Sequence, residues 1–157
     1  MNFLNGTVSE KNGLIFTSNN SELKFHLTSE QKDYLKNYVG KEITIGIRPE
    51  NISVENNSST SIELDCILDV IEPMGNESFI YFEIEKTQFI ARVKPLGNIK
   101  VGGKIKLYID PEKIYLFDKK TGDNLTNQFW LLRNVSDRVL KIWLYLHMVV
   151  NFKRTDL

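Results

Sequence analysis

The chain has very few of the residues from which most catalytic and metal sites are built. Its 157 residues include one cysteine, Cys66, and two histidines, His26 and His147. A single cysteine excludes an internal disulfide, and the alternating apolar positions around Cys66 favour a core thiol over a reactive one. Tetrahedral zinc sites and catalytic triads lack their parts, because the two histidines stand apart from any partner. We therefore expect no metal and no cofactor.

Phosphate-binding loops and an excess of charge are also missing. Neither Gly-x-x-x-x-Gly-Lys-Ser/Thr nor Gly-x-Gly-x-x-Gly occurs, so the chain has no nucleotide cradle. Lysine plus arginine and aspartate plus glutamate both number 20, which gives a formal net charge of zero. Nothing in this balance attracts a polyanion. The prediction is a protein that is not an enzyme and that binds no nucleic acid.

Long hydrophobic runs are absent as well. Residues 1–5 have neither a basic start nor an apolar stretch, so we expect no signal peptide. Together with the lone cysteine, this predicts a cytoplasmic protein. The nearest approach to a membrane span is Phe129 to Val150, but a span needs about 20 mostly apolar residues. Four charged residues interrupt that stretch, namely Arg133, Asp137, Arg138 and Lys141.

Residues 126–157 nevertheless form a distinct C-terminal extension. Their apolar residues fall at helical spacing, at Val135, Val139, Ile142, Trp143, Leu146, Val149 and Val150. The pattern predicts an added C-terminal helix that packs on the body or binds a partner. An interfacial membrane helix and an unstructured end are the alternatives.

One stretch of the sequence occurs twice. Val39 to Val54, VGKEITIGIRPENISV, aligns without a gap with Val101 to Leu116, VGGKIKLYIDPEKIYL, 62 positions later. Each copy has a glycine turn, apolar residues at every second position, a Pro-Glu corner and a short apolar run. Alternation predicts a strand with one buried face. Proline fixes φ at the corner, where we expect one tight turn. The repeat therefore predicts an internal duplication with two related lobes.

Short alternating segments between turn residues run through the rest of the first 125 positions. Asn12-Gly13 predicts a hairpin, and Thr28 to Gln31 matches a capping box that begins a short helix ended by Gly40. The polar segment Glu55 to Ser61 divides the lobes, at about 1–55 and 62–125. With about nine short strands and one helix, we predict a mainly β fold made of small barrels.

The two corners differ in charge. Arg48 of the first copy stands where the second copy has Asp110. If the lobes pack about a local twofold axis, these two side chains are placed to form an ion pair.

Four segments in order, MNFLNGTV, GIRPENI, VIEPMGNESFIYF and KLYIDPEKIYLFDKKTGDNL, resemble a known family. It is the C-terminal regulatory region of the ATP-binding subunit of maltose-type ABC sugar importers. The resemblance covers residues 1 to about 125 and implies two OB-like barrels, the TOBE domain. It also implies a place behind an ATPase domain in the cytoplasm, at the inner face of the membrane. The ATPase domain has no counterpart here, and neither do residues 126–157 in the family.

The resemblance supplies the candidate site residues. They match the Arg-Pro-Glu corner, the Glu-x-x-Gly-x-Glu turn and the closing segment of the family. The candidate regulatory or interface positions are Arg48, Pro49, Glu50, Glu72, Pro73, Gly75, Glu77, Asp110, Pro111 and Asp118. Phe117, Gly122 and Leu125 complete the match.

The sequence thus favours a regulatory and dimerisation domain of a sugar-importer ATP-binding subunit. The resemblance implies a homodimer, with the transporter's membrane subunits or a regulatory protein as indirect partners. The alternative is a module that senses a small ligand, a sugar or an oxyanion, between the lobes. A remnant without function is a third reading.

Overall fold

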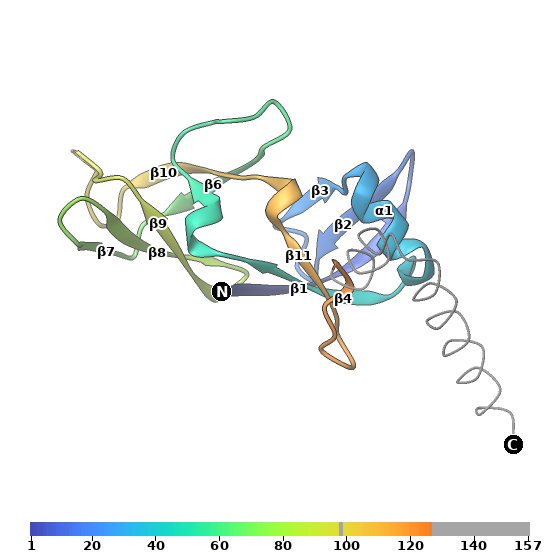
Figure 1. Ribbon diagram of the computed structural model, residues 1–157. Coiled ribbons are helices and arrows are strands. Elements are labelled where there is room, and N and C mark those ends of the chain that lie inside the picture. Colours follow the sequence, from blue (N-terminus) through green and yellow to red (C-terminus); the bar gives the residue numbers. More distant parts are fainter. Residues whose placement is uncertain (98, 127–157) are drawn as a thin grey trace, which may run out of the picture. The chain divides into compact units, whose positions relative to one another are not determined.

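The computed structural model describes residues 1–97 and 99–126 (Figure 1). The predicted C-terminal helix lies outside the described residues, apart from Thr126. The strands are β1 (Asn2–Glu10), β2 (Leu14–Ser18), β3 (Lys24–His26), β4 (Glu42–Ile47), β5 (Ile52–Ser53), β6 (Ile62–Ile67), β7 (Val70–Pro73), β8 (Ser78–Ile84), β9 (Thr87–Val93), β10 (Lys104–Ile109) and β11 (Tyr115–Asp118). The helices are α1 (Ser29–Leu35) and the one-turn 3-10 helices η1 (Lys36–Tyr38), η2 (Pro49–Asn51) and η3 (Pro111–Lys113).

The strands form three antiparallel sheets. A five-stranded sheet has the order β11-β4-β1-β2-β3, and two three-stranded sheets have the orders β5-β10-β6 and β7-β8-β9. Within residues 1–97 and 99–124, α1 is the only α-helix. The predicted mainly β fold with one short helix is confirmed.

The two Pro-Glu corners send their following strands to opposite sheets. β5 leaves the five-stranded sheet and pairs with β10, where Ser53 lies opposite Tyr108. β11 returns to the five-stranded sheet and pairs with β4, where Tyr115 lies opposite Gly46. Ser53 and Tyr115 are copies of each other, 62 positions apart, and so are Gly46 and Tyr108. The duplication thus converts one pair into the other. The duplication therefore relates the two halves by a local twofold operation, and each predicted lobe contributes one strand to the other lobe's sheet.

The predicted capping box begins α1. The Gln31 amide N–H donates to Thr28 Oγ1 over 3.3 Å, and the Thr28 amide N–H donates to Gln31 Oε1 over 2.9 Å. The helix ends at Leu35, however, and not at Gly40 as predicted. The chain continues as the 3-10 turn η1 to Tyr38, and the Gly40 amide N–H then donates to Val8 O over 2.8 Å, which ties Gly40 to β1.

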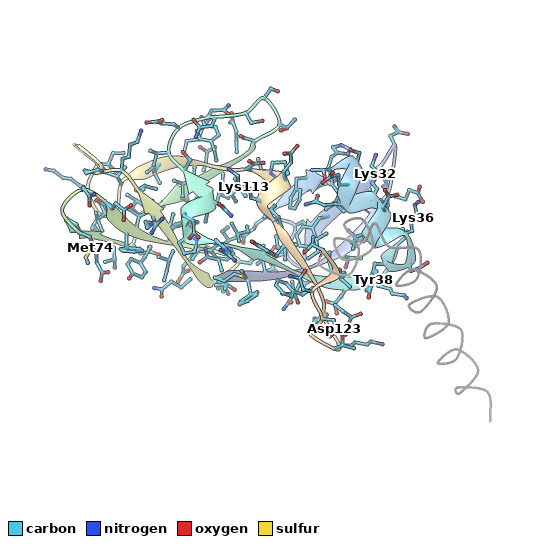
Figure 2. The ribbon with its side chains drawn as sticks, viewed as in Figure 1. Lys32, Lys36, Tyr38, Met74, Lys113 and Asp123 are labelled. Atoms are coloured by element: carbon cyan, nitrogen blue, oxygen red, sulfur yellow. The ribbon has the colours of Figure 1, made fainter. Side chains whose placement is uncertain are left out.

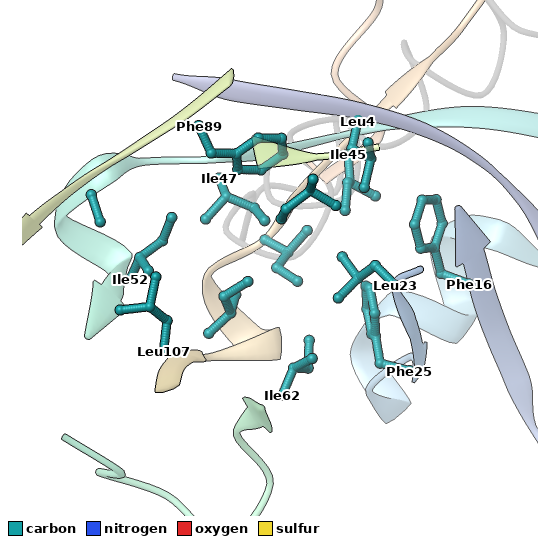
Figure 3. Close-up of a cluster of buried hydrophobic side chains, with 14 of the residues drawn as sticks. Leu4, Phe16, Leu23, Phe25, Ile45, Ile47, Ile52, Ile62, Phe89 and Leu107 are labelled. Atoms are coloured by element: carbon teal, nitrogen blue, oxygen red, sulfur yellow. The ribbon is translucent and has the colours of Figure 1, made fainter. Parts of the chain in front are cut away.

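A single hydrophobic core runs through residues 1–125, which form one compact unit. The inward positions of β4 and β10 supply much of it: Ile43, Ile45, Ile47, Ile105, Leu107 and Ile109 are all buried. Figure 3 shows Ile45, Ile47 and Leu107 in this cluster, together with rings from β2, β3 and β9. Each such side chain stabilises the fold by about 1.5–3 kcal/mol. The alternation of the two copies thus builds one shared core.

Gly6 marks a close approach within the five-stranded sheet. It occupies an inward position of β1, where a Cβ would overlap the ring of Phe16 and the carbonyl oxygen of Thr17. We predict that Gly6→Ala lowers the free energy of unfolding by about 3 kcal/mol, because the overlap includes backbone that cannot rotate away. Urea denaturation measures the change.

Gly97→Ala is the matched control, since a Cβ there has nothing within 4 Å. Equal stability losses in the two variants would contradict the packing argument.

Candidate functional site

The two corners that the duplication singles out lie against each other. η2 and η3 are single 3-10 turns, as predicted for each Pro-Glu corner. Asn51 Nδ2 donates to Lys113 O over 3.5 Å, and these two residues are copies of each other. The corners therefore meet at the local twofold relation between the halves.

The predicted ion pair between Arg48 and Asp110 does not form. Arg48 Nη1 lies 3.9 Å from Glu50 Oε1, and its guanidinium lies over the Tyr115 ring, 5.1 Å from the centroid. Asp110 Oδ2 lies 3.3 Å from Lys113 Nζ. Each corner supplies its own counterion two or three residues away. The Tyr115 ring adds a contact to Arg48 worth about 0.5–1 kcal/mol at an exposed site. The expected Arg48–Asp110 ion pair was therefore wrong, because both side chains have other partners.

Gln31 holds the second corner. Its Nε2 donates to Pro111 O over 2.7 Å while its Oε1 caps α1, and the side chain is buried. The sequence predicted only the capping role. A glutamate caps a helix equally well but has no N–H to donate, so the choice of glutamine was the available clue.

Asn2 joins the five-stranded sheet to β9, and the sequence interpretation missed it. Its Nδ2 donates to Ile90 O over 2.8 Å and to Ile47 O over 3.1 Å. Its Oδ1 accepts from the Ile90 amide N–H over 2.8 Å. The side chain is buried, so these bonds satisfy groups that water does not reach. A polar residue at an inward position of an alternating strand was the only sign of this role.

Asp118 closes the five-stranded sheet at its other end. It accepts a 2.8 Å hydrogen bond from the Tyr38 hydroxyl, and its Oδ1 accepts from the amide N–H groups of Lys120 and Thr121. These donors, Thr121 first, lower the pKa of Asp118. Burial and the Asp118 carboxylate raise the pKa of Tyr38 to about 12. The pair links β11 to the segment after α1, where Figure 2 labels Tyr38.

The Glu72–Glu77 turn between β7 and β8 is a separate candidate element. Glu72 Oε2 accepts from the Tyr81 hydroxyl over 2.9 Å, and Glu77 Oε1 lies 3.9 Å from Arg92 Nε. Gly75 has φ +80, a conformation that favours glycine. Pro73 ends β7 opposite Ser78, and its ring is exposed.

Residues from the first corner, from the segment after it and from the end of β9 line a groove of about 350 Å³. It is lined by Glu50, Ile52, Ser53, Val54, Glu55, Asn57, Arg92, Val93 and Lys94. Arg92 borders the groove and also contacts Glu77, so it connects the first corner with the β7–β8 turn. Lys94 Nζ lies 3.5 Å from Glu55 Oε1. The groove thus offers two cations, each already close to a carboxylate. Glu72 and Asp118 do not line it.

Other kinds of site receive no support from residues 1–97 and 99–126. No group of three His, Cys, Asp or Glu side chains there is arranged to hold a metal ion. Cys66 is half-buried, and burial raises the pKa of its thiol to about 11, so it stays protonated at neutral pH. In the same residues, no helix has the length and apolar character to cross a membrane.

Two family models match the chain in succession. The MalK OB fold domain matches residues 1–52, and the TOBE domain matches residues 45–117. They overlap at residues 45–52, where the structure has the end of β4, the first corner and the start of β5.

Several curated proteins are similar to this chain. The xylose/arabinose import ATP-binding protein XacK of Haloferax volcanii is 30% identical over 132 residues, 82% of this chain and 33% of that protein. The oligosaccharides import ATP-binding protein MsmX of Bacillus subtilis is 36% identical over 91 residues, 55% of this chain and 24% of that protein. The trehalose/maltose import ATP-binding protein MalK of Thermococcus litoralis is 26% identical over 78% of this chain and 33% of that protein. The chain thus spans a third or less of these relatives.

A solved structure shares the fold. The cytoplasmic molybdate-binding protein ModG, crystallised with molybdate bound, superposes with a TM-score of 0.58 at 17% identity. The match covers 73% of this chain and 94% of that one.

The Tyr38–Asp118 hydrogen bond gives a pH-dependent prediction. We expect Tyr38→Phe to lower the free energy of unfolding by about 1 kcal/mol at pH 7, the usual net value of one such bond. Because the folded pKa of Tyr38 lies above its usual 10, its contribution is complete below pH 10 and is lost as the pH rises towards 12. Asp118 has a lowered pKa, so its contribution holds at neutral pH and is lost in acid.

Urea denaturation from pH 3 to pH 11 tests both the alkaline loss of stability through Tyr38 and the acid loss through Asp118. Tyr108→Phe is the control, because no hydrogen bond of the Tyr108 hydroxyl is found within the described residues. A stability difference between wild type and Tyr38→Phe that stays constant to pH 11 would contradict the assignment.

Proposed function

Because this chain belongs to the family of MalK OB-fold and TOBE domains of ABC-importer ATP-binding subunits, we propose that it is a regulatory and dimerisation domain of a sugar importer. It contributes binding surfaces and no chemistry. It acts in the cytoplasm at the inner face of the membrane, as part of a transporter assembly. ATP-driven import, which the relatives' names state, is proposed for the assembly and not for this polypeptide.

The strand exchange at the two corners is the observation that carries this proposal. Each Pro-Glu corner delivers its strand to the other half, and the corners contact through Asn51 and Lys113. The exchange ties both halves into one unit with one core. Such a unit holds its surfaces in fixed relation, which a domain needs if it is to pass a partner's signal between subunits.

The range of relatives supports regulation over sugar selection. Their names state different cargoes: xylose or arabinose, oligosaccharides, and trehalose or maltose. A region shared among them at similar identity is not expected to choose the sugar. We propose a second copy of this domain as the direct partner, with the membrane subunits or a regulatory protein reached through the assembly.

Self-association is the test of this proposal. We expect sedimentation velocity between about 0.5 and 100 μM to show a reversible monomer–dimer equilibrium, the behaviour of a chain with a protein interface of standard size. A coupled assay should detect no ATP hydrolysis at the same concentrations. A strict monomer at 100 μM would contradict the dimerisation role.

A second candidate function is sensing of a small ligand. The 350 Å³ groove between the first corner and β9 favours it, since ligand pockets begin at roughly 300 Å³ and Arg92 and Lys94 both border the groove. The shared fold with a molybdate-binding protein is consistent with an oxyanion. Glu77 and Glu55 already lie beside the two cations, so an anion must displace them. Because of this competition, we rank ligand sensing below dimerisation as the proposed function.

Calorimetric titration separates the two functions. If the groove senses a ligand, molybdate, sulfate, glycerol phosphate or maltose gives a binding isotherm that Arg92→Ala abolishes. Lys100→Ala, a lysine outside the groove lining, is the matched control. No heat from any of the four compounds would exclude the ligand class on which this candidate rests.

A further inference from the structure

The dipeptide Asn-Gly occurs twice in the sequence, once in a turn and once in a strand. Asn12-Gly13 lies in the turn that joins β1 to β2, and Asn5-Gly6 lies within β1. Asparagine before glycine is prone to attack on its own side-chain amide, because glycine has no Cβ to obstruct the approach of its backbone nitrogen. The two dipeptides have the same intrinsic chemistry, so any large difference in their reactivity comes from the fold.

The turn leaves the reacting atoms of Asn12-Gly13 accessible. Asn12 is exposed. Within residues 1–97 and 99–126, neither its side chain nor the Gly13 amide N–H makes a hydrogen bond. The backbone hydrogen bond inside the turn uses other groups, the Lys11 amide N–H and Gly13 O, which are 2.9 Å apart. A surface turn rotates its backbone at little cost in free energy, so the Gly13 nitrogen can reach Asn12 Cγ.

The strand protects Asn5-Gly6 from the same reaction. Asn5 Oδ1 accepts a hydrogen bond from Thr44 Oγ1 over 2.7 Å. Gly6 lies opposite Ser18 of β2 and Ile43 of β4, so a strand on each side holds its backbone. The peptide plane between Asn5 and Gly6 cannot turn towards the Asn5 side chain unless the sheet opens. The same dipeptide is therefore available at one position and blocked at the other.

Two basic side chains lie beside Gly13. A Cβ built on Gly13 would lie 3.4 Å from Lys32 Nζ and 3.9 Å from His26 Nδ1. The Gly13 nitrogen must lose its proton before it attacks, and a cation at this distance stabilises the negative charge that remains. The turn thus combines an accessible asparagine amide with a charge that favours its attacker.

We propose that Asn12 is a site of spontaneous covalent modification, at which the folded chain deamidates. The deprotonated Gly13 nitrogen attacks Asn12 Cγ, so an N–Cγ bond forms and the Cγ–Nδ2 bond breaks. The amide nitrogen leaves as ammonia, with its two hydrogens and the proton taken from Gly13. One water molecule then opens the five-membered imide at either carbonyl, which leaves aspartate or isoaspartate at position 12. Water is the only co-reactant.

Both products change the end of the β1–β2 hairpin. A carboxylate replaces the neutral amide, which adds a negative charge beside Lys11 and Lys32. Isoaspartate also places a side-chain methylene in the backbone of a turn where Asn12 has φ 52 and Gly13 has φ 125. The class of reaction that consumes this product is methyl transfer from S-adenosylmethionine to the free α-carboxylate of isoaspartate. The turn is therefore a substrate for isoaspartyl methylation, whereas β1 is not.

Peptide mass spectrometry of the aged protein tests the site. The whole chain is incubated at mildly alkaline pH, folded in buffer or unfolded in concentrated urea, and then digested. In buffer we expect Asn12 to deamidate at least about tenfold faster than Asn5, since Asn5 reacts only when the central strand opens. In urea the two rates should agree within about twofold, because both positions are then unfolded Asn-Gly. Methyl transfer from labelled S-adenosylmethionine identifies the isoaspartate.

Two results would overturn the proposal. One is a folded chain in which Asn5 reacts as fast as Asn12. The other is a folded chain that stays intact at both positions over the time that modifies both in urea. Asn12→Gln is the control variant, because its longer side chain must close a six-membered ring. It keeps the exposed amide, and its turn should remain unmodified while Asn5 in urea reacts as in the wild-type chain.

Lys32→Met tests the contribution of the charge beside Gly13. We expect deamidation at Asn12 to slow about twofold in the folded chain, the effect of one exposed charge, with no change in urea. Lys36→Met is the matched control, because Lys36 lies one turn further along, where its Nζ is 2.9 Å from Asp33 Oδ1 (Figure 2). Equal slowing in both variants, or in neither, would overturn the role of Lys32 and leave the site at Asn12 to be judged by its comparison with Asn5.

Discussion

The exchange of strands at the two Pro-Glu corners is the constraint on which the rest of this structure depends. A strand that follows a tight turn can fold back and pair within its own sheet. Here β5 and β11 each cross to the other half and cover the open edges of β10 and β4. An uncovered β4 or β10 would expose a row of unpaired backbone groups. Each half therefore completes the other, and the core extends through both without interruption.

Once the strands are exchanged, a few buried or half-buried polar groups determine how the halves meet. The Asn2 amide satisfies both backbone groups of Ile90, and Gln31 links the cap of α1 to the second corner. Tyr38 and Asp118 tie the end of β11 to the segment after α1. Hydrogen bonds of this kind add little net energy each, but an unpaired partner would be costly. They therefore select one arrangement of the two halves.

The same architecture places the candidate functional features on the surface of the described residues. The duplicated strands devote their inward positions to a common core, and the groove beside the first corner has cations that are already close to carboxylates. The outward positions of β1, β4 and β11 are freed from packing, and there the Phe3 and Phe117 rings meet with centroids 5.8 Å apart. This division is consistent with the binding role proposed above and with a region that relatives named for importing several sugars share.

Periodicity and local chemistry determined much of this protein from its sequence alone. Alternation at Ile43, Ile45 and Ile47, the 62-residue repeat, both proline corners and the capping box at Thr28 all follow from short-range rules and appear in the structure as predicted. Only the tertiary structure decided which sheet receives β5 and β11, because alternation looks the same whether a strand stays or crosses. It also decided that Arg48 contacts Tyr115 and not Asp110, and that Asn2 holds Ile90. Those partners are far apart along the chain, and no local pattern encodes a distance that only the assembled core sets.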